Sequence, residues 1–172
     1  MDKVENVVLI GMPGCGKSTC GVLAAKALLK KFVDTDLVIQ EREGMALQDI
    51  IREKGNDYFR RAEEEAVCLL EIDHAVIATG GSVVYSRRAM EHLKKRSVVV
   101  YLRISFDTMM RRISDMAERG ILLREGESIE AMYSERTPLY ERYADLILDC
   151  DGREIERTLS EIVANVRAFA KG

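Results

Sequence analysis

Residues 11–19 read GMPGCGKST, which fits the pattern GxxxxGK[ST]. An apolar run at residues 7–10 precedes them, and a segment of helical periodicity at residues 17–30 follows. Glycines in this pattern let successive backbone N–H groups turn toward one anion, and the helix N-terminus adds partial positive charge. We therefore expect a nucleoside triphosphate to bind through its phosphates. The residues expected to contact it are Gly14, Cys15, Gly16, Lys17, Ser18 and Thr19.

The order within this loop also suggests separate roles. Lys17 would reach the β- and γ-phosphates, and the Ser18 hydroxyl would help to hold Mg²⁺, as in P-loop enzymes generally. The alternative is a glycine-rich turn that only begins a helix. The apolar run and the helical segment on either side of the loop disfavour that alternative.

Two carboxylates, Asp34 and Asp36, follow a short apolar run at residues 32–33. Alternate residues of a strand face the same side, so both carboxylates could point toward the phosphate loop from the carboxyl end of a neighbouring strand. A metal ion and an acceptor hydroxyl would lie there. The alternative is an acidic turn in solvent. The DxD pattern alone would favour that turn, and only the presence of the phosphate loop favours a site.

Two further segments could contribute to a site. Arg60 follows an aromatic residue on a predicted helix and also has Glu64 at i,i+4, so a solvated ion pair explains most of its pattern. Residues 79–82 read TGGS after an apolar run, which suits either close approach of backbone to a ligand or a tight turn. The sequence leaves both alternatives open.

The segment at residues 116–127 contains glycines together with Arg119 and Arg124. It could be an ordinary loop, or the mobile arm that excludes water and brings positive charge to the γ-phosphate in a phosphoryl transferase. Further on, Arg136 stands just before Pro138 within a helical pattern. The proline predicts either a kink or the start of a new helix.

Short apolar runs alternate with longer helical segments, which predicts an α/β fold with a parallel sheet. Strands are expected at residues 7–10, 32–33, 76–78, 98–102 and 146–148. Helices are expected at residues 17–30, 57–70, 87–95, 106–115, 129–143 and 154–169, with two short helices broken near Gly44 between residues 37 and 54. The last helix carries an apolar stripe and is expected to be structural, packed on the sheet.

Composition narrows the classes of protein. A chain of 172 residues fits one domain, and a net charge of -3 argues against nucleic-acid binding. No apolar run approaches the ~18 residues of a membrane span, and the N-terminus lacks the pattern of a signal peptide. Four cysteines without CxxC spacing predict free thiols in a reducing compartment. We therefore expect a cytoplasmic monomer with no membrane or nucleic-acid partner.

Over nearly its whole length the chain resembles the shikimate kinase family. Besides the P-loop, residues 32–36 resemble its FxDxD element, residues 59–63 its FRxxE, residues 79–81 its glycine-rich substrate loop and residues 136–140 its RxPLY. The resemblance implies a three-layer P-loop fold with a five-stranded parallel sheet flanked by helices. It also implies a single kinase domain, residues 1–172, with a lid at about 116–127 and a substrate-binding helical region at about 37–70.

The resemblance further assigns roles to individual residues. Asp34 would act with Ser18 on the Mg²⁺ side, while Asp36 would contact the acceptor hydroxyls and take up the proton. The remaining residues implied are Arg60 and Arg136 on the substrate carboxylate, Gly80 and Gly81 on the substrate through their backbone, Arg112 against the adenine, and Arg119 closing on the phosphates. Catalysis would then rest on Lys17, Asp36 and Arg119.

The chain departs from the family pattern at two places. Ser82 stands where the family loop usually has a third glycine, and Arg119 is followed by Gly-Ile-Leu-Leu instead of Pro-Leu-Leu, so Arg124 is an alternative lid arginine.

The expected function is Mg²⁺- and ATP-dependent phosphorylation of the 3-hydroxyl of shikimate. The alternatives are a kinase of the same architecture for another small hydroxy acid or polyol, and a non-catalytic nucleotide-binding regulatory module. A nucleoside monophosphate kinase would leave the RxPLY segment unexplained.

Overall fold

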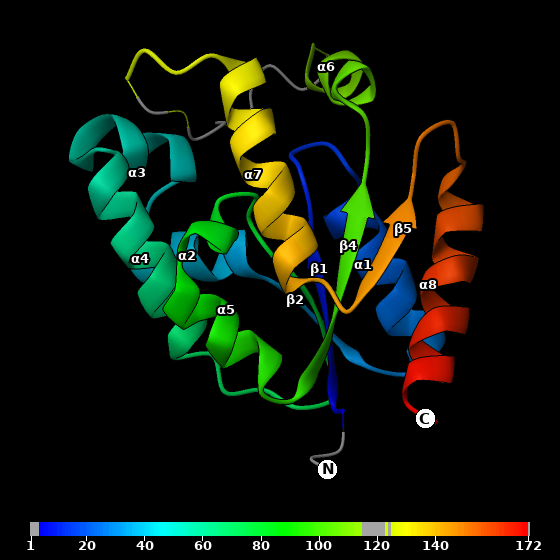
Figure 1. The fold of residues 1–172 in the computed structure, drawn as a ribbon. Coiled ribbons are helices and arrows are strands. Elements are labelled where there is room, and N and C mark those ends of the chain that lie inside the picture. Colours follow the sequence, from blue (N-terminus) through cyan, green and yellow to red (C-terminus); the bar gives the residue numbers. More distant parts are fainter. Residues whose placement is uncertain (1–3, 115–122, 124, 172) are drawn as a thin grey trace.

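A five-stranded parallel sheet lies at the centre of this computed structural model, which describes residues 4–114, 123 and 125–171. The strand order is β2-β3-β1-β4-β5, and every neighbouring pair is parallel. The strands are β1 (Asn6–Ile10), β2 (Lys31–Asp34), β3 (Ala75–Ala78), β4 (Ser97–Arg103) and β5 (Leu146–Asp149). Helices cover both faces of this sheet (Figure 1), so the predicted three-layer α/β class is confirmed.

The helices have nearly the predicted bounds. They are α1 (Lys17–Leu28), α2 (Thr35–Glu43), α3 (Leu47–Lys54), α4 (Asn56–Cys68), the 3₁₀ turn η1 (Val83–Tyr85), α5 (Arg87–Lys94), α6 (Phe106–Ser114), α7 (Ile129–Tyr143) and α8 (Ile155–Phe169). The break near Gly44 is confirmed, because this glycine ends α2 with φ 67°. None of the helices in the described part of the chain has the length and apolar character that a bilayer crossing requires.

The central strands are buried because they are apolar on both faces. Every residue of β1 is buried, and β4 is buried as far as Leu102. Strands with helices on both sides need such continuous apolar sequence. Burial of β1 between β3 and β4 places the loop that follows it, and hence the glycine-rich segment, at the middle of the carboxyl edge of the sheet.

Helix α7 runs without interruption through Pro138, so of the two predicted alternatives, a kink or a new helix, the new helix is wrong. Proline removes one backbone hydrogen bond from a helix interior. Here the helix is held on both sides of the proline by the buried side chains of Met132, Arg136 and Tyr140. Thr137 also donates its hydroxyl to the Tyr133 carbonyl at 2.8 Å.

The apolar interior has two parts. The larger one surrounds the sheet and includes the buried strands together with α1, α5, α7 and α8. A second cluster joins Ile39 of α2, Ile50 of α3 and Phe59 and Ala66 of α4. The helical region at residues 37–70 therefore has a hydrophobic centre of its own beside the sheet.

Candidate active site

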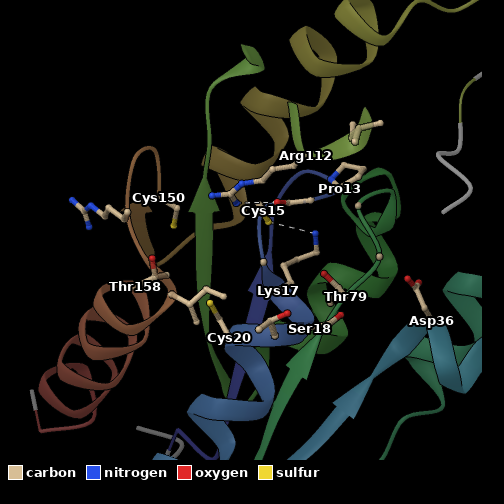
Figure 2. Close-up of a pocket in the computed structure, with 18 residues that line it drawn as sticks. Pro13, Cys15, Lys17, Ser18, Cys20, Asp36, Thr79, Arg112, Cys150 and Thr158 are labelled. Atoms are coloured by element: carbon tan, nitrogen blue, oxygen red, sulfur yellow. Dashed lines mark hydrogen bonds between the residues drawn. The ribbon is translucent and has the colours of Figure 1, made fainter. Parts of the chain in front are cut away.

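A cleft of about 490 Å³ opens at the carboxyl ends of the strands. Figure 2 shows residues of the glycine-rich loop on one side of it, Asp36 and Thr79 on a second side, and Cys150 and Thr158 on a third. In open α/β sheets ligands bind at this edge. The cleft therefore lies where the sequence predicted a nucleotide.

The glycine-rich loop has a backbone that its glycines make possible, because Gly11, Gly14 and Gly16 all have positive φ. Gly11 has φ 149°, and a Cβ there would lie 2.7 Å from the Leu102 carbonyl oxygen. Gly16, with φ 100°, precedes α1, and no side chain caps this helix. The first N–H groups of α1 are thus available to an anion in the cleft, where the helix dipole favours negative charge.

Lys17 lies folded against its own loop. Its Nζ donates to the Gly11 carbonyl at 2.7 Å and to the Met12 carbonyl at 2.9 Å, and lies 3.6 Å from Cys15 Sγ. Lys17 as a whole is 8% exposed. A phosphate in the cleft would compete with these carbonyls for the ammonium group.

Asp34 connects the loop to β2. Its Oδ2 accepts a hydrogen bond from Ser18 Oγ at 2.8 Å, and its Oδ1 accepts one from the Asp36 backbone N–H at 2.9 Å. Through the second bond Asp34 caps α2. The hydroxyl and carboxylate oxygens of Ser18 and Asp34 are ligands of the kind that Mg²⁺ prefers.

Asp36 does not lie on β2, so the prediction that strand alternation places it beside Asp34 is wrong. The strand ends at Asp34, and Asp36 belongs to the first turn of α2. The reason is the cap: the Asp34 carboxylate stabilises the start of a helix at the position where the strand was expected to continue. Asp36 still faces the cleft (Figure 2), on the side of Gly80.

A smaller cavity of about 50 Å³ adjoins the cleft beside the glycine-rich loop. The two hollows share four lining residues, which are Pro13, Asp36, Gly80 and Gly81. The remaining lining residues of the smaller cavity are Leu47, Ile51, Phe59, Glu63, Ser82 and Arg136. A small polar acceptor in this cavity would thus lie beside a phosphate held by the loop.

Gly80 and Gly81 allow charged side chains to approach the backbone. A Cβ at Gly80 would lie 2.8 Å from Glu63 Oε2 and 2.9 Å from Asp36 Oδ1, and one at Gly81 would lie 3.0 Å from Arg136 Nη1. The Gly81 carbonyl also accepts a hydrogen bond of 2.6 Å from the buried Tyr140 hydroxyl. Close approach to side chains of the site therefore accounts for the two glycines.

Glu63 is a buried carboxyl group in this cavity, with 2% of its surface exposed. Burial raises its pKa to about 7 and the Asp36 charge adds to this, while a hydrogen bond from Ser82 and the charges of Arg136 and Arg60 oppose it. The Ser82 hydroxyl donates to Oε1 at 2.8 Å. Oε2 has no hydrogen-bond partner among the described residues, so it is available to a ligand in the cavity.

The position of Glu63 on the apolar face of α4 could have been noticed in the sequence. Phe59, Glu63, Ala66 and Val67 recur at helical spacing, and all four are buried. A carboxyl group in such a stripe is rarely buried without a partner. The sequence interpretation gave Glu63 no site role beyond its place in the FRxxE motif.

Arg60 and Arg136 come together at one aromatic ring. The guanidinium carbons of Arg60 and Arg136 lie 4.7 and 5.3 Å from the centroid of the Tyr85 ring. Arg136 is 2% exposed. Glu64 instead accepts from Ser86 Oγ at 2.6 Å and lies 3.5 Å from Arg88 Nη1, so the predicted Arg60–Glu64 pair is wrong.

The other end of the cleft is formed by α6 and the turn from β5 to α8. Arg112 donates to the Gly14 carbonyl at 2.9 Å and lines the cleft. Sequence reasoning missed the other residues there, which are Ile113, Cys150, Arg153, Ile155 and Thr158. The carboxyl end of β5 was the available signal, because ligands bind at that edge.

Helix α8 was predicted to be structural, but part of it also lines the cleft. Ile155 is 45% exposed and lines the cleft instead of packing on the sheet, and Thr158 lines it as well. The buried thiols beside them are weak acids: burial raises the pKa of Cys20 to about 11 and that of Cys150 to about 12. At neutral pH these cysteines stay protonated and are poor nucleophiles.

Arg119 and Arg124 lie outside the described residues, so the choice between them as lid arginine remains a prediction. Of the expected lid at residues 116–127, only 123 and 125–127 are described. The Leu123 carbonyl accepts a hydrogen bond of 2.6 Å from Asn56 Nδ2, at the start of α4. This end of the segment thus contacts the helix that carries Arg60 and Glu63.

Known proteins are similar to this chain in sequence and fold. A family model described as shikimate kinase matches residues 13–167. A shikimate kinase of Sulfurihydrogenibium sp. (strain YO3AOP1) is 33% identical over 165 residues, covering 95% of this chain and 99% of the relative. One from Clostridium botulinum (strain Alaska E43 / Type E3) is 37% identical over 164 residues, covering 95% of each. The structure of the shikimate kinase from Acinetobacter baumannii in complex with shikimate matches with a TM-score of 0.87 at 26% identity, covering 96% of this chain and 94% of that one.

Proposed function

We propose that this chain, which belongs to the shikimate kinase family, transfers the γ-phosphoryl group of ATP to the 3-hydroxyl of shikimate. One observation carries the proposal: Arg136 and the two carboxylates of Asp36 and Glu63 line a small cavity that adjoins the phosphate loop, and Arg60 meets Arg136 at the Tyr85 ring. A small acid with several hydroxyls offers one group for each of these partners. The similar kinase from Acinetobacter baumannii, in its complex, has shikimate as its ligand.

The residues of the loop would bind and polarise the nucleotide. Lys17 would leave the loop carbonyls for the β- and γ-phosphates, and Arg112 would lie against the adenine. Ser18 and Asp34, whose oxygens are 2.8 Å apart, would hold Mg²⁺. When bound, Mg²⁺ neutralises charge on the phosphates during phosphoryl transfer.

The smaller cavity would position the acceptor. Arg60 and Arg136 would bind its carboxylate, for which the forked donors of guanidinium groups are suited. Asp36, beside Gly80, would orient the acceptor hydroxyl and take up its proton. Gly80 and Gly81 would contact the acceptor through backbone. Such positioning and charge neutralisation are most of what phosphoryl transfer requires.

Ser82 was the reason to consider another hydroxy acid or polyol as acceptor. Its hydroxyl donates to Glu63 at 2.8 Å, and the residue is 5% exposed. The serine is therefore hydrogen-bonded within the protein, which supports a tolerated variation over a contact to a different substrate.

Two other expectations go with this function. One is a lid arginine, Arg119 or Arg124. The other is a cytoplasmic monomer, and free thiols suit the reducing compartment this implies; they are Cys15, Cys20, Cys68 and Cys150.

The test is ADP release by the purified protein with Mg-ATP and a panel of acceptors: shikimate, other small hydroxy acids, polyols and nucleoside monophosphates. We expect strong stimulation by shikimate alone. Stimulation by another acceptor would move the assignment to a different kinase of this fold, and ATP binding without any stimulation would favour the regulatory module. A Lys17→Met variant controls for contaminating kinases.

A further inference from the structure

Tyr85 ends the 3₁₀ turn η1, three residues after Ser82, and neither the P-loop chemistry nor the family motifs involve it. Its ring is the meeting point of the two arginines. The Arg60 guanidinium carbon lies 4.7 Å from the ring centroid and the Arg136 guanidinium carbon 5.3 Å. Both distances are within the ~6 Å range of cation–π attraction.

Two guanidinium groups this close to one point repel each other, and the repulsion is strong where water is scarce. Arg136 is 2% exposed, and Arg60 Nε is buried with no hydrogen-bond partner among the described residues. Something in the protein must therefore favour this arrangement. The negative face of an aromatic ring attracts both cations at once.

A ring differs from a carboxylate in one respect that matters here. It attracts a guanidinium without carrying charge, so it holds the two arginines while leaving their positive charge in place for an anion. The nearby carboxylates of Asp36 and Glu63 would instead offset the charge of the arginines if both were ionised. Burial raises the pKa of Glu63 to about 7, so that at neutral pH this carboxyl group offsets less of the positive charge.

We propose that Tyr85 is a positioning residue of the acceptor cavity, whose ring holds the guanidinium groups of Arg60 and Arg136 together to receive a carboxylate. The assignment of that carboxylate to the acceptor rests on the proposed function. The ring is the larger part of the interaction, because the hydrogen bond from Arg136 Nε to the Tyr85 hydroxyl is long, at 3.4 Å.

The test compares Tyr85→Phe, which keeps the ring, with Tyr85→Leu, which removes it. We expect the leucine variant to raise the acceptor KM about tenfold, the size of one or two cation–π contacts, while kcat and the KM for ATP change less than about twofold. The phenylalanine variant should behave like the wild type. Tyr143→Leu is the matched control, because Arg142 lies 5.9 Å from that ring at the far end of α7.

An acceptor analogue without the carboxylate separates positioning from general damage. Wild type and Tyr85→Leu should bind this analogue equally weakly. Equal losses for shikimate and for the analogue, or failure of phenylalanine to restore the KM, would overturn the proposal. If the leucine variant does not fold, Tyr85→Met serves in its place.

A measurement without substrate keeps this inference separate from the proposed function. Absence of shikimate phosphorylation by the wild type would refute the function but not the role of Tyr85. Denaturant unfolding of Tyr85→Leu, Arg60→Met and the double variant forms a double-mutant cycle. We expect the tyrosine substitution to lower stability less once Arg60 is replaced, and additive effects would overturn the positioning role.

Discussion

Replacement of Ser82 by alanine should destabilise the protein more at alkaline than at acidic pH. Burial raises the pKa of Glu63 from 4.5 to about 7, so the folded protein holds this proton more tightly than the unfolded chain does. The contribution of Glu63 to the free energy of unfolding is therefore fully present below pH 4.5 and is lost as the pH rises through 7.

The Ser82 hydroxyl donates to Glu63 Oε1 at 2.8 Å and lowers the pKa of this buried group. Its loss should cost about 1 kcal/mol while Glu63 is neutral and about 1.5–3 kcal/mol once it is ionised. The difference corresponds to a pKa of Glu63 that rises by roughly one further pH unit in the variant. The destabilisation should thus grow by about 0.5–2 kcal/mol between mildly acidic and alkaline pH.

The assay is urea unfolding of wild type and Ser82→Ala at a series of pH values from acidic to alkaline. The matched control introduces the same substitution into Glu63→Gln, where no proton can be gained or lost at this position, and where the effect of the alanine should not vary with pH. A destabilisation that is the same at every pH in the Glu63 background would refute the reasoning. It would mean that the hydroxyl does not act on the ionised carboxylate.

Three further outcomes follow from the site. Lys17→Met should abolish ADP release while leaving the circular dichroism spectrum unchanged, and residual turnover would remove this lysine from the chemistry. Gly80→Ala should weaken acceptor binding by about 1–3 kcal/mol in steady-state kinetics, because its methyl group would lie 2.8 Å from Glu63 Oε2; an unchanged acceptor KM would show that the cavity can relax. Arg60→Ala and Arg136→Ala should each raise the acceptor KM by the equivalent of about 2–5 kcal/mol with ATP saturating, and unchanged values in both would exclude a carboxylate clamp.

The strands and most helix bounds could be predicted because they depend on local patterns. The run at residues 98–102 is apolar at every position, and such a strand fits a parallel sheet wherever it lies in the order. The glycine-rich loop carries its phosphate chemistry within nine residues. These signals need no knowledge of distant contacts.

The predictions from the sequence fail where a single side-chain interaction decides the local structure. Asp34 accepts the Asp36 N–H and begins a helix, which removes Asp36 from the strand on which it was predicted. The roles of Glu63 and Tyr85 depend on residues 19 to 51 positions away, as the Ser82–Glu63 and Arg136–Tyr85 hydrogen bonds show. No local pattern encodes such pairings, so only the fold reveals them.

The separate cluster of Ile39, Ile50, Phe59 and Ala66 has a consequence for how the molecule opens. Units with their own apolar centre can unfold locally at a lower free energy than the whole domain. Helices α2 to α4 could then lose protection against amide hydrogen exchange while β1 and β4 keep theirs. Because α4 carries Arg60 and Glu63, an acceptor bound to both would stabilise the folded form of these three helices. Their amide hydrogen exchange would then slow, and its rate would report how much of the cavity is occupied.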